Sequence, residues 1–325
     1  ADRSTRIWNP TTGEAKLTID GNVILGEAGP RPPRARAFAA DNNAALFGAG
    51  RGFIRIADPG EHSIYDFTNG DSITLEAWVN PFDVADGQQV YIVGKGRTKV
   101  AADNQNWALR LSASGGRLRP SFLFRNADNR KGHTEDFHRW VGDEGVGSGT
   151  GWHHVAVSYT FGDPDSIRGY VDGRPVQGRW DYGGPTDKPP VVDDDEIWVG
   201  SSVNGNMANT FPGLLDDVAI HRSIIPPERI AARWDVDEKV PPVPAVTLAP
   251  VPESAVLCEI IESVPDGSWY FGSRTPTETF TRPFFAFTEL PQRYDDSGVR
   301  ADRPAPFVLR VRSHVVLPEG PQRIT

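Results

Sequence analysis

Carboxylates are the first residues to consider for chemistry, because many β-rich proteins cleave glycosidic bonds with a pair of them. A retaining glycosidase needs two carboxyl groups about 5 Å apart, and alternate positions of one strand can supply them. The spacing Glu-x-Asp-x-x-Glu, which would provide such a pair, is absent. Glu76 is the lone carboxylate of its segment, Ser72–Val79. We therefore expect an exposed or loop-bound glutamate on the outer face of a sheet and no polysaccharide hydrolysis.

A second group of candidates lies in residues 126–151, the longest polar stretch of the chain. His133, Glu135 and His138 could ligate a metal ion, although their spacing matches no metal motif that we know. An exposed Trp140 could instead stack on a sugar ring, since sugar sites combine an aromatic platform with a few polar groups. A long insertion without regular structure is more often functional or disordered than structural. We predict these four residues as ligand-binding residues.

The acidic pair Asp216–Asp217 interrupts an apolar segment, Leu214–Ile220. In a strand, Asp216 shares its face with Val218 and Ile220, so we expect its side chain to point inward. A buried carboxylate must be neutralised or hydrogen-bonded. Calcium is one solution, because it accepts carboxylate and carbonyl oxygens in flexible geometry. Hydrogen bonds from loop amides are the other.

The segments that must position these residues are predicted to be short strands separated by Gly, Pro, Asn and Asp. In Ser72–Val79, apolar residues alternate with Thr74, Glu76 and Trp78. Two Asp-Gly pairs, in 19–22 and 170–173, favour tight hairpin turns. The further strands are expected at Phe53–Ile56, Val90–Val93, Trp107–Leu111, Pro120–Phe124, His153–Tyr159, Ile167–Val171, Glu196–Val199 and Leu214–Ile220.

One helix is expected, at Pro227–Trp234, with proline at its first turn followed by Glu228. Ile230 and Trp234 lie four residues apart, so they share the face that would pack on the strands. Many strands with one short helix predict an all-β fold, a sandwich or jelly roll.

Composition excludes several function classes. The chain has 325 residues and a net charge of −9, which disfavours sequence-independent nucleic-acid binding. No apolar run approaches the 18 residues of a membrane span. Cys258 is the single cysteine, so we expect no intramolecular disulfide, no thiolate metal cluster and no c-type haem in this segment.

Five fragments in order resemble LamG-like domains of the concanavalin A-like jelly-roll class. They are SITLEAWVNP (72–81), YIVGKG (91–96), WHHVAV (152–157), GYVDG (169–173) and FPGLLDDVAI (211–220). The resemblance implies two packed antiparallel sheets over about residues 15–236. It also implies a structural calcium near the last of these strands and a turn that Ala40–Asn43 matches, with Asn where the family has Gly. We therefore expect a calcium held by Asp41, Asp216 and Asp217.

The domain organisation is predicted from proline. Residues 1–237 form the LamG-like jelly-roll domain, and the proline-dense segment 238–252 is a stiff linker. Residues 253–325 form a second β-rich segment, a truncated domain, with strands at Ala255–Ile261 and Phe307–Leu317. This segment resembles the opening of the protective-antigen-like β-domains in large exported planctomycete proteins. That resemblance implies a piece of a longer bacterial chain, in the periplasm or at the cell surface.

The leading functional hypothesis is a non-enzymatic recognition, adhesion or spacer module of an exported multidomain protein. Its expected partners are a glycan or a protein surface and other domains of the larger chain, with no nucleic acid and no membrane span. Two alternatives stay open. One is a structural or docking subunit of a larger assembly, and the other is a glycan-active enzyme with an unrecognised site.

Overall fold

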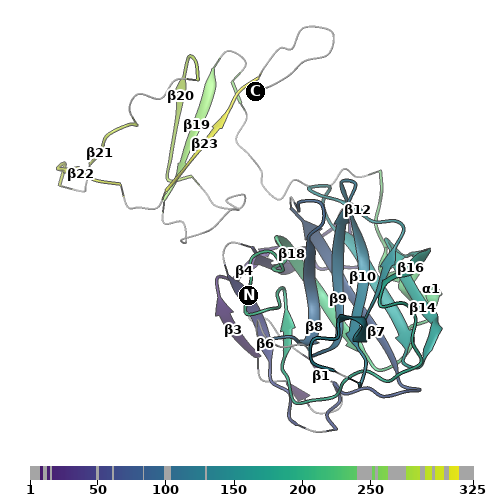
Figure 1. Cartoon of the computed structure of the whole chain (residues 1–325). Coiled ribbons are helices and arrows are strands. Elements are labelled where there is room, and N and C mark those ends of the chain that lie inside the picture. The colour runs from purple at the N-terminus through teal and green to yellow at the C-terminus, as the bar shows by residue number, and fades with distance from the viewer. Residues whose placement is uncertain are drawn as a thin grey trace. The chain divides into compact units, whose positions relative to one another are not determined.

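The chain is divided by its contacts into two compact units, Ala1–Val243 and Pro244–Thr325, which are described separately (Figure 1). The computed structural model describes residues 8–9, 13–14, 17–48, 51–60, 62–82, 84–98, 104–128, 130–239, 251–252, 255–262, 276–285, 290–294, 297–303 and 307–314. Most of the expected linker, residues 240–250, lies outside the described residues.

Unit 1 is built from two large antiparallel sheets. The nine-stranded sheet contains, in spatial order, β16 (Gly178–Tyr182), β11 (Phe137–Gly142), β10 (Arg117–Arg125), β9 (Gln105–Ser114), β8 (Gln89–Gly96), β17 (Ile197–Val199), β6 (Gly52–Ile56) and β3 (Leu17–Gly21), with β12 (Val146–Gly147) paired to β10. The seven-stranded sheet contains β15 (Arg174–Val176), β14 (Asp163–Val171), β13 (His153–Thr160), β7 (Ser72–Pro81), β18 (Gly213–His221), β5 (Asn43–Phe47) and β4 (Ile24–Ala28). A separate hairpin joins β1 (Trp8–Asn9) to β2 (Gly13–Glu14).

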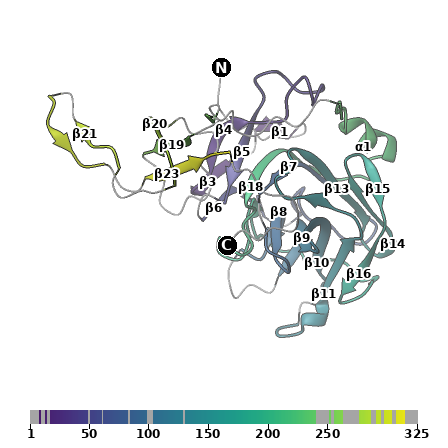
Figure 2. The same ribbon diagram turned by 90° about the horizontal axis from the view of Figure 1, so that it is seen from above.

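The hydrophobic core lies between the two sheets, which Figure 2 shows as two layers. Strand β7 shows how the sequence pattern builds it. Ile73, Leu75, Ala77 and Val79 are fully buried members of the core, as their alternation predicts. Every other strand expected in residues 53–220 is also present, so the all-β sandwich of the jelly-roll class is confirmed.

The two Asp-Gly pairs behave differently. Asp172 and Gly173 have φ values of 50° and 72° and close a two-residue hairpin between β14 and β15, as predicted. The hairpin expected at Asp20-Gly21 is wrong. Strand β3 pairs with β6 and β4 pairs with β5, so the chain passes here from one sheet to the other. A turn motif fixes the local backbone, whereas the partner of each strand is decided by burial.

Helix α1 (Pro227–Arg233), the one α-helix in the described part of the chain, covers part of the outer face of the seven-stranded sheet. Its Ile230 is fully buried against Ala156 and Tyr170 of that sheet. Trp234, directly after the helix, stacks on Trp78 of β7 with 5.3 Å between the rings. This confirms the packing expected from the spacing of Ile230 and Trp234.

Residues 126–151 are not an irregular insertion, which corrects the expectation from their polarity. A 3₁₀ turn, η1 (Thr134–Asp136), leads into β11, and β12 follows. The alternation that makes β11 is Phe137 and Arg139 on one face and His138 and Trp140 on the other. Polar residues in both sets hid this period from the sequence analysis.

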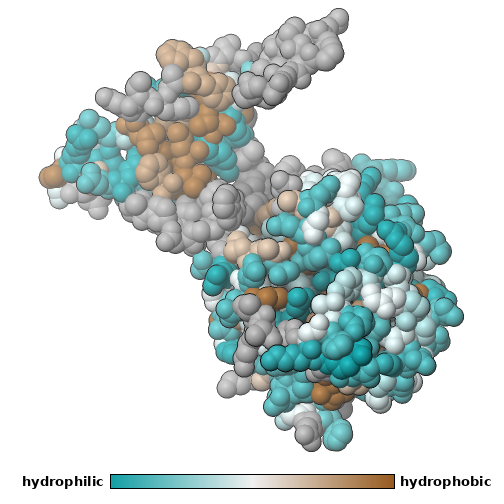
Figure 3. Space-filling view, in the orientation of Figure 1, coloured by the Kyte–Doolittle hydropathy of each residue, from teal (hydrophilic) through white to brown (hydrophobic). Residues whose placement is uncertain are grey.

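Unit 2 contains a three-stranded sheet in which β19 (Val256–Ile261) lies between β20 (Glu278–Arg282) and β23 (Val308–Arg312), and a short pair, β21 (Arg293–Tyr294) with β22 (Arg300–Ala301). All of β19 is buried, including Cys258. Figure 3 shows apolar residues gathered over this sheet. The expected strand Phe307–Leu317 is described as β23, and its residues 315–317 lie outside the described part of the chain.

Candidate functional site

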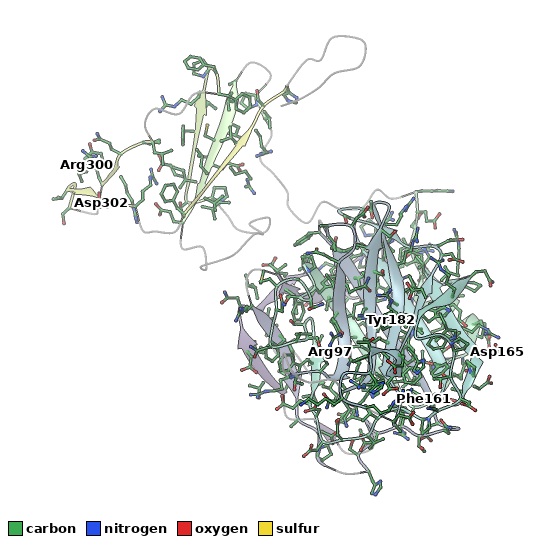
Figure 4. All side chains as sticks on the ribbon, viewed as in Figure 1. Arg97, Phe161, Asp165, Tyr182, Arg300 and Asp302 are labelled. Atoms are coloured by element: carbon green, nitrogen blue, oxygen red, sulfur yellow. The ribbon has the colours of Figure 1, made fainter. Side chains whose placement is uncertain are left out.

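The outer face of the nine-stranded sheet carries a group of arginine and aromatic side chains. The register places Tyr91 opposite Arg110, Arg110 opposite Ser121, and Arg139 opposite Tyr182. These residues alternate with core residues such as Leu109, Leu111 and Phe122, so they face away from the core. We call Tyr91, Arg97, Arg110, Phe137, Arg139 and Tyr182 the arginine face; Figure 4 labels Arg97 and Tyr182 in unit 1.

Tyr91 is the centre of this arrangement and is fully buried. Its hydroxyl oxygen accepts a hydrogen bond from Arg97 Nη1 at 3.2 Å and donates its proton to Gln105 Oε1 at 3.1 Å. The Arg110 guanidinium lies over the Tyr91 ring, 5.3 Å from its centroid. That of Arg97 lies 5.6 Å from the centroid of Phe137.

The electrostatics of the arginine face follow from these contacts. Burial lowers the pKa of Arg110; the Tyr91 hydroxyl opposes this shift, whereas the nearby charges of Arg139 and Arg97 add to it. Burial alone would raise the pKa of the Tyr91 hydroxyl, yet the charges of Arg110 and Arg97 hold this pKa below its ordinary value. The arginine face thus gathers three arginines, Arg97, Arg110 and Arg139, in a chain whose net charge is −9.

Sequence analysis missed the arginine face, although a signal exists. Strands β9 and β10 read LRL and RLRPSFLFR, with arginine at alternate positions. Alternation with apolar residues places those arginines together on one face of a sheet. Only the strand order, which brings β8 and β11 beside them, shows that Tyr91 and Arg139 join the group.

Glu76 belongs to a different cluster, on the outer side of the seven-stranded sheet. It is only 3% exposed, so it is not the exposed carboxylate of one sequence-based reading. Its Oε1 accepts from His221 Nε2 at 2.9 Å and lies 3.1 Å from Arg233 Nη2, and its Oε2 lies 3.2 Å from His154 Nε2. Although burial favours the neutral acid, the hydrogen bonds and charges of these partners hold the pKa of Glu76 far below its ordinary value. A carboxylate so held cannot deliver a proton near neutral pH.

The four predicted ligand-binding residues are not brought together as one exposed site. His133 and Glu135 are exposed and hydrogen-bonded to each other beside η1. His138 is buried between Asn126 and the Gly184 carbonyl, and burial lowers its pKa.

Trp140 is 3% exposed and belongs to the core, so an exposed sugar platform at this residue is wrong. A methyl group at Gly169 would lie 2.3 Å from Trp140 Cη2, which shows how closely the sheet encloses the ring. The physical reason is register. Trp140 pairs with Phe122, another core residue, and therefore faces inward.

Asp216 lies beside the expected turn at residues 40–43, as its contact with Asn42 shows. Its side chain, however, lies on the outer face of the sheet and does not point into the core. A β-bulge between Asp216 and Ala219 adds one residue to β18, and Asp217 takes a left-handed φ of 45° there. Asp216 consequently shares a face with Trp78 and not with the core-facing Leu215. The expected inward orientation with Val218 and Ile220 is wrong, because a bulge breaks the two-residue period.

The Asp216 carboxylate has one amide partner from the predicted loop, the side chain of Asn42. Asn42 Nδ2 donates to Asp216 Oδ2 at 2.6 Å and to the Pro30 carbonyl at 3.1 Å. Burial raises the pKa of Asp216 to about 6. Asp41 and Asp217 are exposed. Among the described residues, no group of three His, Cys, Asp or Glu side chains is placed to hold a metal ion.

Comparison with known families adds a classification to this geometry. The profile of Laminin_G_3, described as the concanavalin A-like lectin/glucanases superfamily, matches residues 47–231. No curated protein matches the chain. Within the described residues, none of the helices is long and apolar enough to cross a membrane.

Among solved structures, domain 4 of AbnA, an extracellular arabinanase from Geobacillus stearothermophilus in complex with arabinotriose, is 16% identical and covers 70% of this chain and 91% of its own, with a TM-score of 0.43. A heptameric SAP-like pentraxin from Limulus polyphemus is 13% identical over 56% of this chain and 81% of its own, with a TM-score of 0.37. The binding domain of Paraclostridial Mosquitocidal Protein 1 is 13% identical over 71% of this chain and 49% of its own, with a TM-score of 0.47. The chain thus spans about half of that last structure.

Proposed function

The chain belongs to the concanavalin A-like lectin/glucanases superfamily, and we propose that it is a recognition module that binds a glycan without cleaving it. The observation that carries the proposal is the arginine face. It combines an exposed aromatic ring, Tyr182, which is 42% exposed, with arginine donors on a rigid sheet. Aromatic stacking together with a few directed polar groups is what sugar recognition requires.

The absence of catalysis is proposed from the chemistry of the same face. Glycoside hydrolysis uses two carboxyl groups, one of which must act as a proton donor. The central strands β8, β9 and β10 of the arginine face contain no Asp or Glu. Glu76 lies on the other sheet, where its carboxylate is bound to His154 and to Arg233 of α1.

A structural calcium is part of the proposal. Rotating the Asn42 amide by 180° would turn its oxygen toward Asp216 Oδ2 and the Pro30 carbonyl, which its nitrogen now contacts. The nitrogen and oxygen of an amide have nearly the same shape, so both orientations fit the space. Oxygen atoms of these three kinds suit calcium. The raised pKa of Asp216 indicates that a cation would relieve the burial of its charge. Asp41 and Asp217 are the remaining candidate ligands.

The wider context is also proposed, with the resemblance of unit 2 to exported β-domains as its support. The chain would be one recognition segment of an exported bacterial protein, in the periplasm or at the cell surface, next to other domains. Cell fractionation with an antibody against unit 1 tests this. Recovery of the native protein in the cytoplasm would contradict it.

The binding proposal is tested by titrating the full chain against a panel of plant and bacterial polysaccharides, with release of reducing sugar measured in the same samples. We expect binding without turnover, and weaker binding by Tyr182→Ala. Tyr294→Ala is the matched control, because Tyr294 is also exposed but lies in unit 2. No binding to any polysaccharide would overturn the proposal in favour of a docking subunit. Turnover that Glu76→Gln abolishes would favour an enzyme.

A further inference from the structure

Arg110 is a buried cation without a carboxylate partner among the described residues. It is 3% exposed, and its Nη2 donates to the Ser121 hydroxyl at 3.3 Å. Its Nε is also buried and has no hydrogen-bond partner. An uncompensated buried charge is unfavourable for folding, because the group loses hydration and gains no opposite charge.

The other buried cations of unit 1 contrast with Arg110. Lys95, fully buried on the same sheet, has its Nζ 2.6 Å from both Asp58 Oδ2 and Asp66 Oδ1. Arg125 lies 3.9 Å from Asp136, which is also buried. This fold therefore neutralises its buried cations with its own carboxylates. The exception at Arg110 indicates that its counter-charge comes from outside the chain.

Arg97 and Arg139 show where that charge would enter. Both are close enough to Arg110 to lower its pKa through their charges. Arg139 is neutralised by a bidentate pair with Asp181, at 2.7 and 2.9 Å. Arg97 has no carboxylate partner among the described residues, and it is partly exposed. Its φ of 55° is a left-handed conformation that is costly for a residue other than glycine. The backbone thus holds this arginine, whose side chain hydrogen-bonds the Tyr91 hydroxyl, at a conformational cost.

We propose that the arginine face binds an acidic polysaccharide through its carboxylate or sulfate groups. Arg97 contacts the anionic group, and Arg110 attracts it from beneath. The Tyr182 ring, which lies 5.7 Å from the Arg139 guanidinium, packs on the sugar. This inference rests on the proposed function and narrows its ligand to anionic glycans. Because arginine presents several donors in one plane, it suits both kinds of group.

The net charge of the chain makes the inference testable. At −9 the protein as a whole repels polyanions, so binding of one requires a local positive site. We would titrate the full chain with polygalacturonate and with dextran sulfate, and use galactan and dextran as their uncharged counterparts. We expect binding to at least one charged polymer, little binding to its uncharged counterpart, and weakening as salt is added. The charged polymer that binds identifies the anionic group.

Three variants locate the site. Arg97→Gln should weaken binding by about tenfold, the loss expected for one charge-assisted contact. Arg174→Gln is the control, because its side chain is 77% exposed on β15 and its removal changes the net charge equally. Arg110→Gln should weaken binding while leaving the melting temperature unchanged or higher. A purely structural Arg110 would instead lower the melting temperature.

The binding results distinguish a failure of the anionic-ligand inference from a failure of the proposed recognition function. Equal binding of charged and uncharged polymers, or an Arg97→Gln variant that binds like the parent, would overturn the anionic ligand and leave a recognition module. Binding of no polysaccharide would overturn both. Binding that Arg97→Gln and Arg174→Gln weaken equally would show general electrostatic attraction and would also overturn the inference.

Discussion

Glu76 and His154 form a buried pair across two neighbouring strands, with 3.2 Å between Oε2 and Nε2. The other ring nitrogen of His154, Nδ1, is buried without a hydrogen-bond partner among the described residues. Arg233, at the end of α1, lies against the same carboxylate. One glutamate therefore connects two strands of the seven-stranded sheet to the helix that covers them.

Glu76→Gln is expected to destabilise unit 1 by about 3 kcal/mol, because it removes the charge that its buried and half-buried partners require. The pKa of Glu76 is lowered in the folded state, so its contribution is complete above the ordinary value of 4.5. That contribution is lost as the pH falls through the lowered value. Urea unfolding at pH 7 and pH 3 measures the effect. A variant as stable as the parent at pH 7 would refute the structural role.

A core position for Trp140 predicts a mutation pattern opposite to that of a sugar platform. Trp140→Ala should destabilise unit 1 by about 3–5 kcal/mol, the cost of removing a buried aromatic side chain. Tyr182→Ala should change stability by less than about 1 kcal/mol, because it is 42% exposed. Thermal unfolding separates the two. A stable Trp140→Ala protein that has lost sugar binding would restore the platform interpretation.

The sequence was sufficient for the sandwich because its signals are local and repeated. Alternation in Ser72–Val79, the turn at Asp172-Gly173 and the proline before Glu228 each fix an element without reference to its neighbours. The same alternation correctly separates Ile73 and Leu75 from Glu76.

The candidate site could be predicted far less well, since it depends on which strands become neighbours. Arg110 and Tyr91 are 19 positions apart, and Tyr182 is much farther along the chain, yet one sheet joins them. A single bulge reversed the expected direction of Asp216. The polarity of residues 126–151 led to the wrong expectation of exposed side chains at His138 and Trp140. His138 can be buried because both its ring nitrogens have hydrogen-bond partners, and Trp140 is buried because it pairs with Phe122.

The buried cluster of Lys95 predicts a second stability effect. Lys95→Met should destabilise unit 1 by about 3–5 kcal/mol, because Asp58 and Asp66 would remain buried without a cation. The triple change Lys95→Met, Asp58→Asn and Asp66→Asn should recover part of that loss, since apolar or neutral replacements of a whole ion cluster are tolerated better than one missing partner. Chemical denaturation measures both. Additive losses in the triple variant would contradict the coupling.

Cys258 offers a probe of unit 2 alone. It is the single cysteine, it is fully buried, and burial raises the pKa of its thiol. A thiol reagent should therefore react only when the sheet of unit 2 opens. Glu259, the next residue, binds Arg310 and Arg312 across to β23. Glu259→Gln should speed the reaction of Cys258 by at least about tenfold, whereas the tryptophan fluorescence, which comes from unit 1 except for Trp269, should change little. Unaltered thiol kinetics would show that these pairs do not hold the sheet.

Asp216 gives the test of calcium. If calcium binds between Asp216 and Asn42, a chelator should lower the melting temperature by several degrees, since binding to the folded state alone stabilises by about 2.7 kcal/mol at a hundredfold excess over Kd. Asp216→Ala should abolish that sensitivity. Without calcium, the charged Asp216 carboxylate should destabilise the folded protein. The pKa of Asp216 is raised from 3.8 to about 6, so the metal-free protein should lose stability as the pH rises through 6. Asp216→Asn should then be more stable than the parent at pH 8 in chelator, and less stable than the parent in calcium. A melting temperature that changes with neither calcium nor chelator would contradict a calcium site. Asp216 would then be a structural carboxylate that is stabilised by its hydrogen bond from the Asn42 amide.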